Sequence, residues 1–185
     1  MIRETKRLVL REFRESDLDA FYEMMNDPEY QRYEGKFMSR EEAEKKLQAI
    51  ISWGEVTPRV KYQLAITARP NDQMVGVIKL SENFPEVEEW EIGWGIHPSF
   101  WGCAYAPEAA YSMLRFAFEE LQINRVVAFC HAGNRPSVRV MEKLGMQREA
   151  HLRETRLLDG VRYDEYLYAI LRSDYLKQTE NGAAR

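Results

Sequence analysis

The sequence predicts an α/β fold of the mixed, α+β type, in a single domain that covers residues 1–172. Two patterns predict it: apolar and polar residues alternate in short strand-like runs, and apolar residues recur at helical spacing in the stretches between these runs. The composition agrees, because 185 residues with 45% hydrophobic and 30% charged side chains can bury one substantial core. We expect residues 173–185 to form a polar C-terminal tail.

The first half of the chain predicts strands on both sides of a pair of helices. The expected elements are a strand at 7–13, helices at 16–25 and 39–51, and strands at 62–67 and 74–80. Ser39 and Glu42 have the spacing of a capping box, so the second helix begins there. Pro70 and the Asn-Asp pair that follows mark a turn, which makes the two later strands a hairpin.

The second half predicts strands that alternate with helices. The expected elements are a strand at 90–96, a helix at 105–121, a strand at 126–130, a helix at 134–144, and strands at 147–152 and 162–171. A turn signal at Leu158–Gly160 joins the last two strands. Pro107 and Glu108 suit a first helical turn. Asn134 suits an N-cap and Gly145 a left-handed helix end. Together the two halves give about seven strands and four helices.

Charge and cysteine content narrow the class of protein. A net charge of −4 argues against general nucleic-acid binding, which needs a basic surface. No apolar run approaches the roughly 20 residues that span a membrane, and the charged N-terminus lacks a secretion signal. We therefore expect a cytoplasmic protein without a membrane partner. Cys103 and Cys130 have no metal-ligand spacing, so no metal site is expected.

The strand at 90–96 contains two glycines on one face. Strict alternation places Trp90, Ile92, Trp94 and Ile96 on one side, and Glu91, Gly93, Gly95 and His97 on the other. Glycines inside a strand commonly mark a bulge or a place where a ligand or second backbone comes close. The neighbouring acidic residues favour either a solvated hairpin edge or the mouth of a site for a cationic substrate; these are Glu82, Glu86, Glu88, Glu89 and Glu91.

The segment Ser99–Glu108 is a small-residue turn that leads into a helix. Gly102 and Ala104 leave the main chain accessible, and the helix that starts near Tyr105 adds the positive end of its dipole. This pattern predicts a binding site for an anion such as a pyrophosphate. An ordinary strand-to-helix turn is the alternative.

Three segments carry a family resemblance: Glu91–Pro98, Trp101–Ala109 and Asn134–Met146. They resemble the GNAT acetyltransferase superfamily, and within it the branch of the ribosomal-protein serine and alanine N-acetyltransferases. The likeness runs from Thr5–Arg11 to Arg162–Tyr168. It implies a mostly antiparallel central sheet flanked by helices and splayed between the fourth and fifth strands, with acetyl-CoA as cosubstrate and an amine as acceptor.

The resemblance assigns the cofactor-binding residues. The family's loop pattern is Gln or Arg, two residues, Gly, one residue, then Gly or Ala, and here Ser99 departs from the first position. The main chain of the loop would hold the pyrophosphate, through Trp101, Gly102, Cys103, Ala104, Tyr105 and Ala106. The pantetheine arm would pair with the backbone of Trp94, Gly95 and Ile96 and bond Asn134, whose alternative role is a simple N-cap.

The resemblance also indicates the catalytic groups. Ser137 corresponds to a serine near the thioester sulfur, or is an ordinary first-turn helix serine. Other members place a proton-donating Tyr where this chain has Met141, which has no proton to give and suits a core. Glu91 is the expected general base, directly or through water, with a cross-strand ion pair as its alternative. His97 and His131 are weaker candidates for the base.

The remaining expectations concern the oxyanion, the acceptor and the assembly. A backbone N–H near Gly95 or Ile96 would stabilise the oxyanion. We expect direct acetyl transfer from acetyl-CoA to a primary amine, either a protein N-terminus or a small amine. Alternatives are a non-catalytic acyl-CoA binding module and an acetyltransferase for an antibiotic or a polyamine. The acceptor site is expected at Tyr30–Lys36, and a homodimer is possible.

Overall fold

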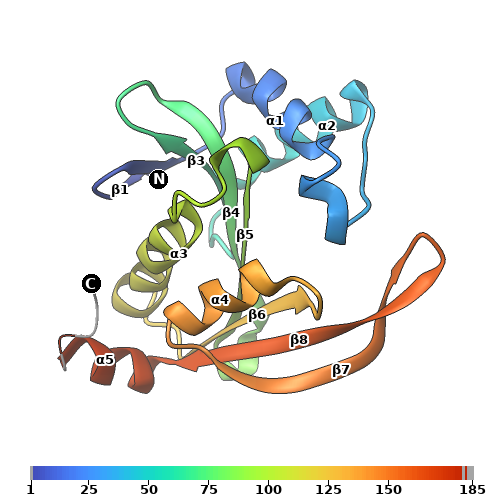
Figure 1. Ribbon diagram of the computed structural model, residues 1–185. Coiled ribbons are helices and arrows are strands. Elements are labelled where there is room, and N and C mark those ends of the chain that lie inside the picture. Colours follow the sequence, from blue (N-terminus) through green and yellow to red (C-terminus); the bar gives the residue numbers. More distant parts are fainter. Residues whose placement is uncertain (1, 181, 183–185) are drawn as a thin grey trace. The chain divides into compact units, whose positions relative to one another are not determined.

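The computed structural model describes residues 2–180 and 182, which form eight strands and five α-helices (Figure 1). The strands are β1 (Ile2–Glu4), β2 (Leu8–Arg11), β3 (Lys61–Ala68), β4 (Gln73–Phe84), β5 (Glu89–Ile96), β6 (Arg125–His131), β7 (Gln147–Leu158) and β8 (Val161–Leu171). The α-helices are α1 (Leu18–Met25), α2 (Arg40–Trp53), α3 (Tyr105–Arg115), α4 (Arg135–Lys143) and α5 (Arg172–Glu180).

The strands form one mixed sheet in the order β1-β2-β3-β4-β5-β6-β8-β7. Neighbours run antiparallel in β1–β2, β2–β3, β6–β8 and β8–β7, and parallel in β5–β6. The expected mixed, mostly antiparallel α/β fold is therefore confirmed. The sheet has one more strand than expected because β1 precedes the first predicted strand.

The chain divides into two compact units. The first comprises the residues up to Leu80 together with Trp94–Ala109, and the second comprises Ser81–Gly93 with the residues from Ala110 onward. Strands β4 and β5 contribute residues to both units. The single domain expected over residues 1–172 stays a prediction.

The core of the first unit lies under α1 and α2. Helix α2 buries Ala43, Leu47 and Ile50, which are four and three residues apart and so share one helical face. They pack with Phe13 and Phe21. The predicted capping box at the start of α2 is confirmed by bonds in both directions between Ser39 and Glu42, 3.2 Å and 2.7 Å long.

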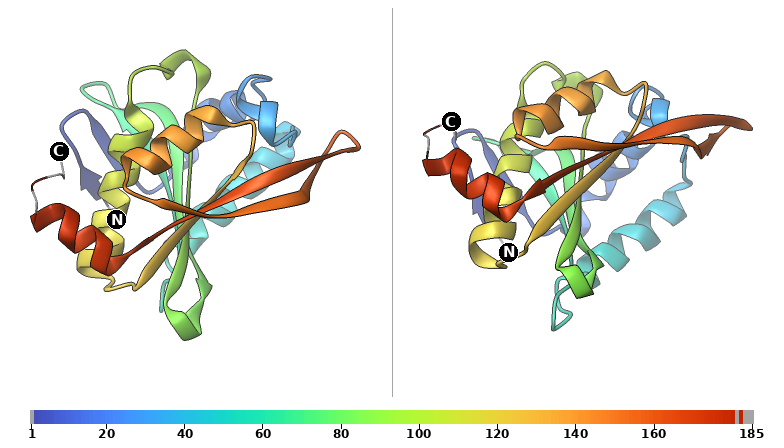
Figure 2. Two further views of the ribbon diagram at one scale, coloured as in Figure 1. Left: turned by 60° about the horizontal axis from the view of Figure 1, so that its bottom comes forward. Right: turned by 90° about the horizontal axis from the view of Figure 1, so that it is seen from below.

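The second unit is organised around β6, β8 and the long β7–β8 hairpin (Figure 2). Asp159 and Gly160 both have positive φ, 49° and 78°, as a tight two-residue turn between strands requires. The predicted turn there is thus confirmed. Helix α4 packs against β6.

The C-terminal residues correct one expectation. Where a polar tail was expected from residue 173, Arg172–Glu180 forms α5. Tyr175 anchors this helix, because its ring is 2% exposed, stacks 5.1 Å from Phe118, and its hydroxyl donates to Glu119 over 2.5 Å. A buried aromatic side chain thus helps to order an otherwise polar segment. The rest of the expected tail, apart from Gly182, lies outside the described residues.

Within the described residues, none of the helices has the length and apolarity needed to cross a membrane. The same part of the chain contains no group of three or more His, Cys, Asp or Glu side chains that could hold a metal ion.

Candidate active site

The pairing of β5 with β6 ends early. Glu89, Trp90 and Glu91 pair with Arg125, Val126 and Val127, and the register stops there although β5 continues to Ile96 and β6 to His131. β5 and β6, which are the fourth and fifth of the expected strands, are thus paired over three residue pairs. This is the split that the resemblance implied for the sheet.

Glu91, the expected base, is partly buried on β5 opposite Val127. Glu91 takes part in an interaction within the structure, and its role as the base stays a prediction. Glu89 has a structural role: it is buried, binds Arg125 over 2.7 Å and accepts from Asn83 over 2.6 Å. The exposed Glu82, Glu86 and Glu88 lie around the β4–β5 turn, as the hairpin interpretation of the acidic stretch requires.

Gly95 allows a close approach, but by a side chain of the first unit. A Cβ atom at Gly95 would lie 2.1 Å from the Tyr30 hydroxyl oxygen, and a Cβ atom at Gly76 would lie 2.3 Å from the Gly95 carbonyl oxygen. Tyr30 is the first residue of Tyr30–Lys36, the segment expected to form the acceptor site. Burial, aided by the charge of Glu34, raises the pKa of Tyr30 well above its usual range, so the phenol stays protonated.

The loop before α3 exposes its main chain. Gly102 has φ +79° with open space where a Cβ would be, and Ala104 has φ +57°. Helix α3 then begins at Tyr105, and the N–H groups of its first turn have no intrahelical acceptor. Because Pro107 has no N–H, the donors at the start of the helix are the backbone N–H groups of Tyr105 and Ala106. An accessible backbone with free donors fits the pyrophosphate of acetyl-CoA.

Trp101 holds this loop to the end of β5. Its indole Nε1–H donates to the Ile96 carbonyl over 2.8 Å, while half of the side chain (52%) stays exposed. This bond occupies one lone pair of a carbonyl that the resemblance assigned to the pantetheine arm. Trp94 and Gly95 are partly buried.

The start of α4 is organised locally. Asn134 accepts a hydrogen bond from the Ser137 N–H over 3.2 Å, so its predicted N-cap role is confirmed. Within the described part of the chain, the Ser137 hydroxyl has no hydrogen bond of its own, and the residue is partly exposed. Met141 is fully buried and belongs to the core, as expected.

Both histidine candidates have local structural roles. The Nδ1 atom of His97 accepts from the Ser99 N–H over 3.2 Å, and that of His131 accepts from the Gly133 N–H over 2.9 Å. The His131 ring also packs 4.7 Å from Tyr163. Each ring therefore caps a turn two residues further on, which supports the structural alternative for both.

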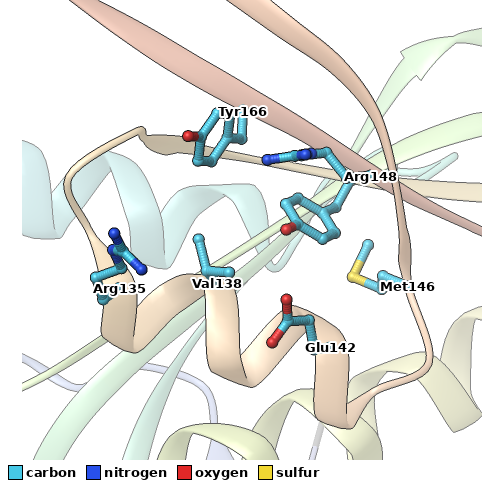
Figure 3. A pocket seen from close by; sticks show the side chains of 7 residues that line it. Arg135, Val138, Glu142, Met146, Arg148 and Tyr166 are labelled. Atoms are coloured by element: carbon cyan, nitrogen blue, oxygen red, sulfur yellow. The ribbon is translucent and has the colours of Figure 1, made fainter.

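A cavity of about 480 Å³ lies in the second unit beside α4. Figure 3 shows the Glu142 carboxylate directed toward it from the helix and the Arg148 guanidinium beside Tyr166. It is lined by Arg135, Val138, Glu142, Met146, Arg148, Tyr166 and Tyr168. None of the predicted site residues lines this cavity.

The predicted site residues fall into two groups. Trp94–Ile96 and Trp101–Ala106 belong to the first unit, where the Trp101 bond joins strand and loop. Glu91, Asn134 and Ser137 belong to the second unit, where a hydrogen bond joins the last two.

Two side chains that were not predicted to bind the cofactor contact predicted cofactor residues. Tyr30 lies against Gly95, and the Arg7 guanidinium donates to the Cys103 and Ala104 carbonyls. Arg7 is separated from Cys103 by 96 positions. A local sequence pattern cannot predict a contact between residues so far apart in the chain. The family resemblance, which begins at Thr5, includes Arg7 but does not indicate its partner.

Comparison with known proteins identifies the family. Residues 7–147 match the acetyltransferase (GNAT) domain. An uncharacterized N-acetyltransferase of Bacillus subtilis (strain 168) is 34% identical over 173 residues, which cover 92% of this chain and 97% of the relative.

Two solved structures share the fold. A RimL ribosomal L7/L12 α-N-protein acetyltransferase in complex with CoA has a TM-score of 0.80 at 21% identity, covering 92% of this chain and 98% of the other. The spermidine N-acetyltransferase of Vibrio cholerae, in complex with CoA and spermine, has a TM-score of 0.80 at 21% identity, covering 93% and 99%. With the domain match over most of its length, this chain belongs to the GNAT acetyltransferase family and is an acetyltransferase that uses acetyl-CoA as its cosubstrate.

Proposed function

We propose that this enzyme transfers the acetyl group of acetyl-CoA to a primary amine, either a protein N-terminal amine or a small amine. The observation that carries the proposal is the loop before α3, where Gly102 and Ala104 have positive φ next to first-turn N–H groups that lack an intrahelical acceptor. Such a backbone binds the pyrophosphate of the cosubstrate, which supplies a thioester as acyl donor.

The binding roles follow from the two groups of residues. Main-chain N–H groups from Trp101 to Ala106 bind the pyrophosphate, so the departure at Ser99 removes one side-chain donor and leaves the cradle intact. The backbone of Trp94–Ile96 orients the pantetheine arm. The Asn134 amide, whose oxygen already caps α4, offers its NH₂ group to the same arm.

The catalytic roles fall to a carboxylate and a hydroxyl. Glu91 accepts, directly or through water, the proton that the amine loses as its nitrogen bonds the acetyl carbon. The carbon–sulfur bond breaks, and the Ser137 hydroxyl donates a hydrogen bond to the departing thiolate. A backbone N–H near Gly95 or Ile96 stabilises the oxygen of the acetyl group as negative charge develops on it.

The position of Tyr30 supports an acceptor site on the segment Tyr30–Lys36. Its phenol, on the segment between α1 and α2, lies against β5 at the residues assigned to the pantetheine arm. An amine bound along this segment would therefore be next to the reacting end of the cosubstrate. The two fold neighbours named above act on a protein N-terminus and on a polyamine, which keeps both kinds of amine within the proposal.

The proposal is tested with acetyl-CoA and a panel of N-terminal peptides, polyamines and aminoglycosides. The acetylated product is measured by mass spectrometry, because the exposed Cys103 would itself react with thiol reagents. Saturating acetyl-CoA should raise the melting temperature, and at least one amine should be acetylated. Absence of both binding and turnover would refute the proposal.

Two substitutions test the catalytic assignments. Ser137→Ala and Glu91→Gln should lower kcat by about tenfold or more with little change in acetyl-CoA affinity. Ser173→Ala and Glu86→Gln change exposed residues of the same types and serve as matched controls. Unchanged turnover in Ser137→Ala or Glu91→Gln would remove that residue from the mechanism.

A non-catalytic acyl-CoA binding module is the second candidate. The burial of Met141 favours it, because this position carries a proton-donating Tyr in other members of the superfamily and here belongs to the core. Binding of acetyl-CoA without turnover of any amine in the panel would support the module over the enzyme.

A further inference from the structure

We propose that Arg7 is a positioning residue that aims the main-chain N–H groups of the loop before α3 at the pyrophosphate. This inference rests on the binding role proposed above for that loop. All of its contacts lie within the first unit.

The Arg7 guanidinium binds the back of the loop. Its Nη1 atom donates to the Cys103 carbonyl over 2.9 Å, and its Nη2 atom approaches the Ala104 carbonyl at 3.5 Å. The Arg7 Cζ atom also lies 5.0 Å from the centre of the Tyr105 ring, within range of a cation–π contact. Arg7 thus contacts three successive residues of the predicted cradle.

Peptide geometry turns these contacts into a direction for the donors. In a planar trans peptide the C=O and the following N–H point in opposite directions. A Cys103 carbonyl directed at Arg7 therefore directs the Ala104 N–H away from it, and the Ala104 carbonyl does the same for the Tyr105 N–H. Two adjacent donors consequently point away from the guanidinium, in a loop where a Cβ at the neighbouring Gly102 would meet no atom within 4 Å.

Glu108 fixes the guanidinium in this place. Its carboxylate accepts from Arg7 Nε over 2.7 Å, from the Arg7 backbone N–H over 3.1 Å, and from the Thr5 hydroxyl over 2.6 Å. The charge of Arg7 and these hydrogen bonds lower the pKa of Glu108 against the effect of its burial, which alone would raise it. Glu108 thus stays ionised at neutral pH, with its charge next to the guanidinium.

The anchor continues into the sheet. The Arg7 carbonyl accepts from the Arg69 N–H over 2.9 Å, next to the pairing of β2 with β3. Ala104 has a left-handed backbone conformation, which is unfavourable for a non-glycine residue, and contacts with a fixed partner can hold it there. Since a guanidinium presents five N–H donors in a plane, its separate nitrogens can bond two carbonyls and a carboxylate at once, whereas an ammonium has three donors on a single nitrogen.

The experiment compares two acyl donors, acetyl-CoA and acetyl-pantetheine, which lacks the pyrophosphate. In Arg7→Ala the Kd for CoA, measured by calorimetry, should rise about tenfold, and KM for acetyl-CoA should rise with kcat at saturation nearly unchanged. The kcat/KM for acetyl-pantetheine should equal that of the unmodified enzyme. Arg7→Lys should give an intermediate Kd. Arg162→Ala, an exposed arginine of β8, is the matched control.

The outcomes separate this inference from the proposed function. An unmodified enzyme that does not bind CoA refutes the binding role itself. CoA binding that is unchanged in Arg7→Ala, or an equal loss with acetyl-pantetheine, overturns the role of Arg7 alone. If Arg7→Ala does not fold, Arg7→Lys decides, because it keeps the charge next to Glu108 and loses the second carbonyl contact.

Discussion

Helices α3 and α4 both begin with residues assigned to the cosubstrate, but their first turns are held in different ways. The start of α3 depends on Thr5 and Arg7, which are separated from Glu108 by 103 and 101 positions. The start of α4 depends on Asn134, which caps it by accepting from a residue three positions later. The same structural device is thus built once from distant contacts and once from local ones.

The difference has a chemical consequence. A local cap supplies one acceptor to one N–H and leaves the surroundings of the helix start unchanged. The charged contacts of Arg7 and Glu108 instead orient whole peptide groups of the preceding loop. The long-range arrangement can therefore aim several donors at a ligand, which a single cap cannot do.

The largest expected contrast is in the reactivity of two cysteines, since each region carries one. Cys103 lies exposed in the loop before α3, whereas Cys130 is 5% exposed in β6 before α4. Burial, with the charge of Glu165 adding to it, raises the pKa of Cys130 to about 11, so at pH 8 roughly one thiol in a thousand is ionised.

Iodoacetamide at pH 8 should therefore alkylate Cys103 at least about a hundredfold faster than Cys130, as followed by peptide mass spectrometry. Denaturant should abolish the difference, and acetyl-CoA should slow labelling of Cys103. Equal labelling rates in the folded protein would contradict the burial of Cys130.

A smaller effect is expected at the two left-handed glycines. Gly102, before α3, and Gly145, after α4, have φ of +79° and +76°. Alanine at either position should lower the free energy of unfolding by about 1.5 kcal/mol, because both require the left-handed region. At Gly145 the new Cβ also meets the end of the Gln178 side chain, which can rotate away.

Cosubstrate affinity separates these two variants. Gly102→Ala places a methyl group where the anion would approach and should raise the Kd for CoA, whereas Gly145→Ala should leave it unchanged. Calorimetry of both variants measures this difference. A change in Kd that is equal in the two would mean that Gly102 acts only on stability.

The smallest effect is expected at the local cap. Asn134→Ala should lower the free energy of unfolding by about 1 kcal/mol, because the Ser137 N–H loses its acceptor. Asn134→Asp keeps an acceptor and should retain that stability. A raised Kd for CoA in Asn134→Asp would show that the amide NH₂ contacts the cosubstrate, and an unchanged Kd would leave Asn134 as a cap alone.

Local patterns predicted most of the fold. The capping box of Ser39, the cap of Asn134 and the turn at Asp159 and Gly160 were all readable, because each depends on residues a few positions apart. The C-terminal helix was missed, since its anchor is the packing of Tyr175 on Phe118, far away in the chain. Strand β1 was missed because it is only three residues long.

The candidate site shows the same difference between local patterns and long-range contacts. By itself the sequence determined the family, the alternating elements and the position of the small-residue loop before α3, because spacing and residue type carry that information. Only the tertiary structure decided that Tyr30 lies against Gly95, that Arg7 and Glu108 hold the loop, and that His97 and His131 cap turns. The first two are contacts between residues that are far apart in the chain and meet only on folding. The two histidine caps depend on the orientation of each ring, which the residue type and spacing do not specify.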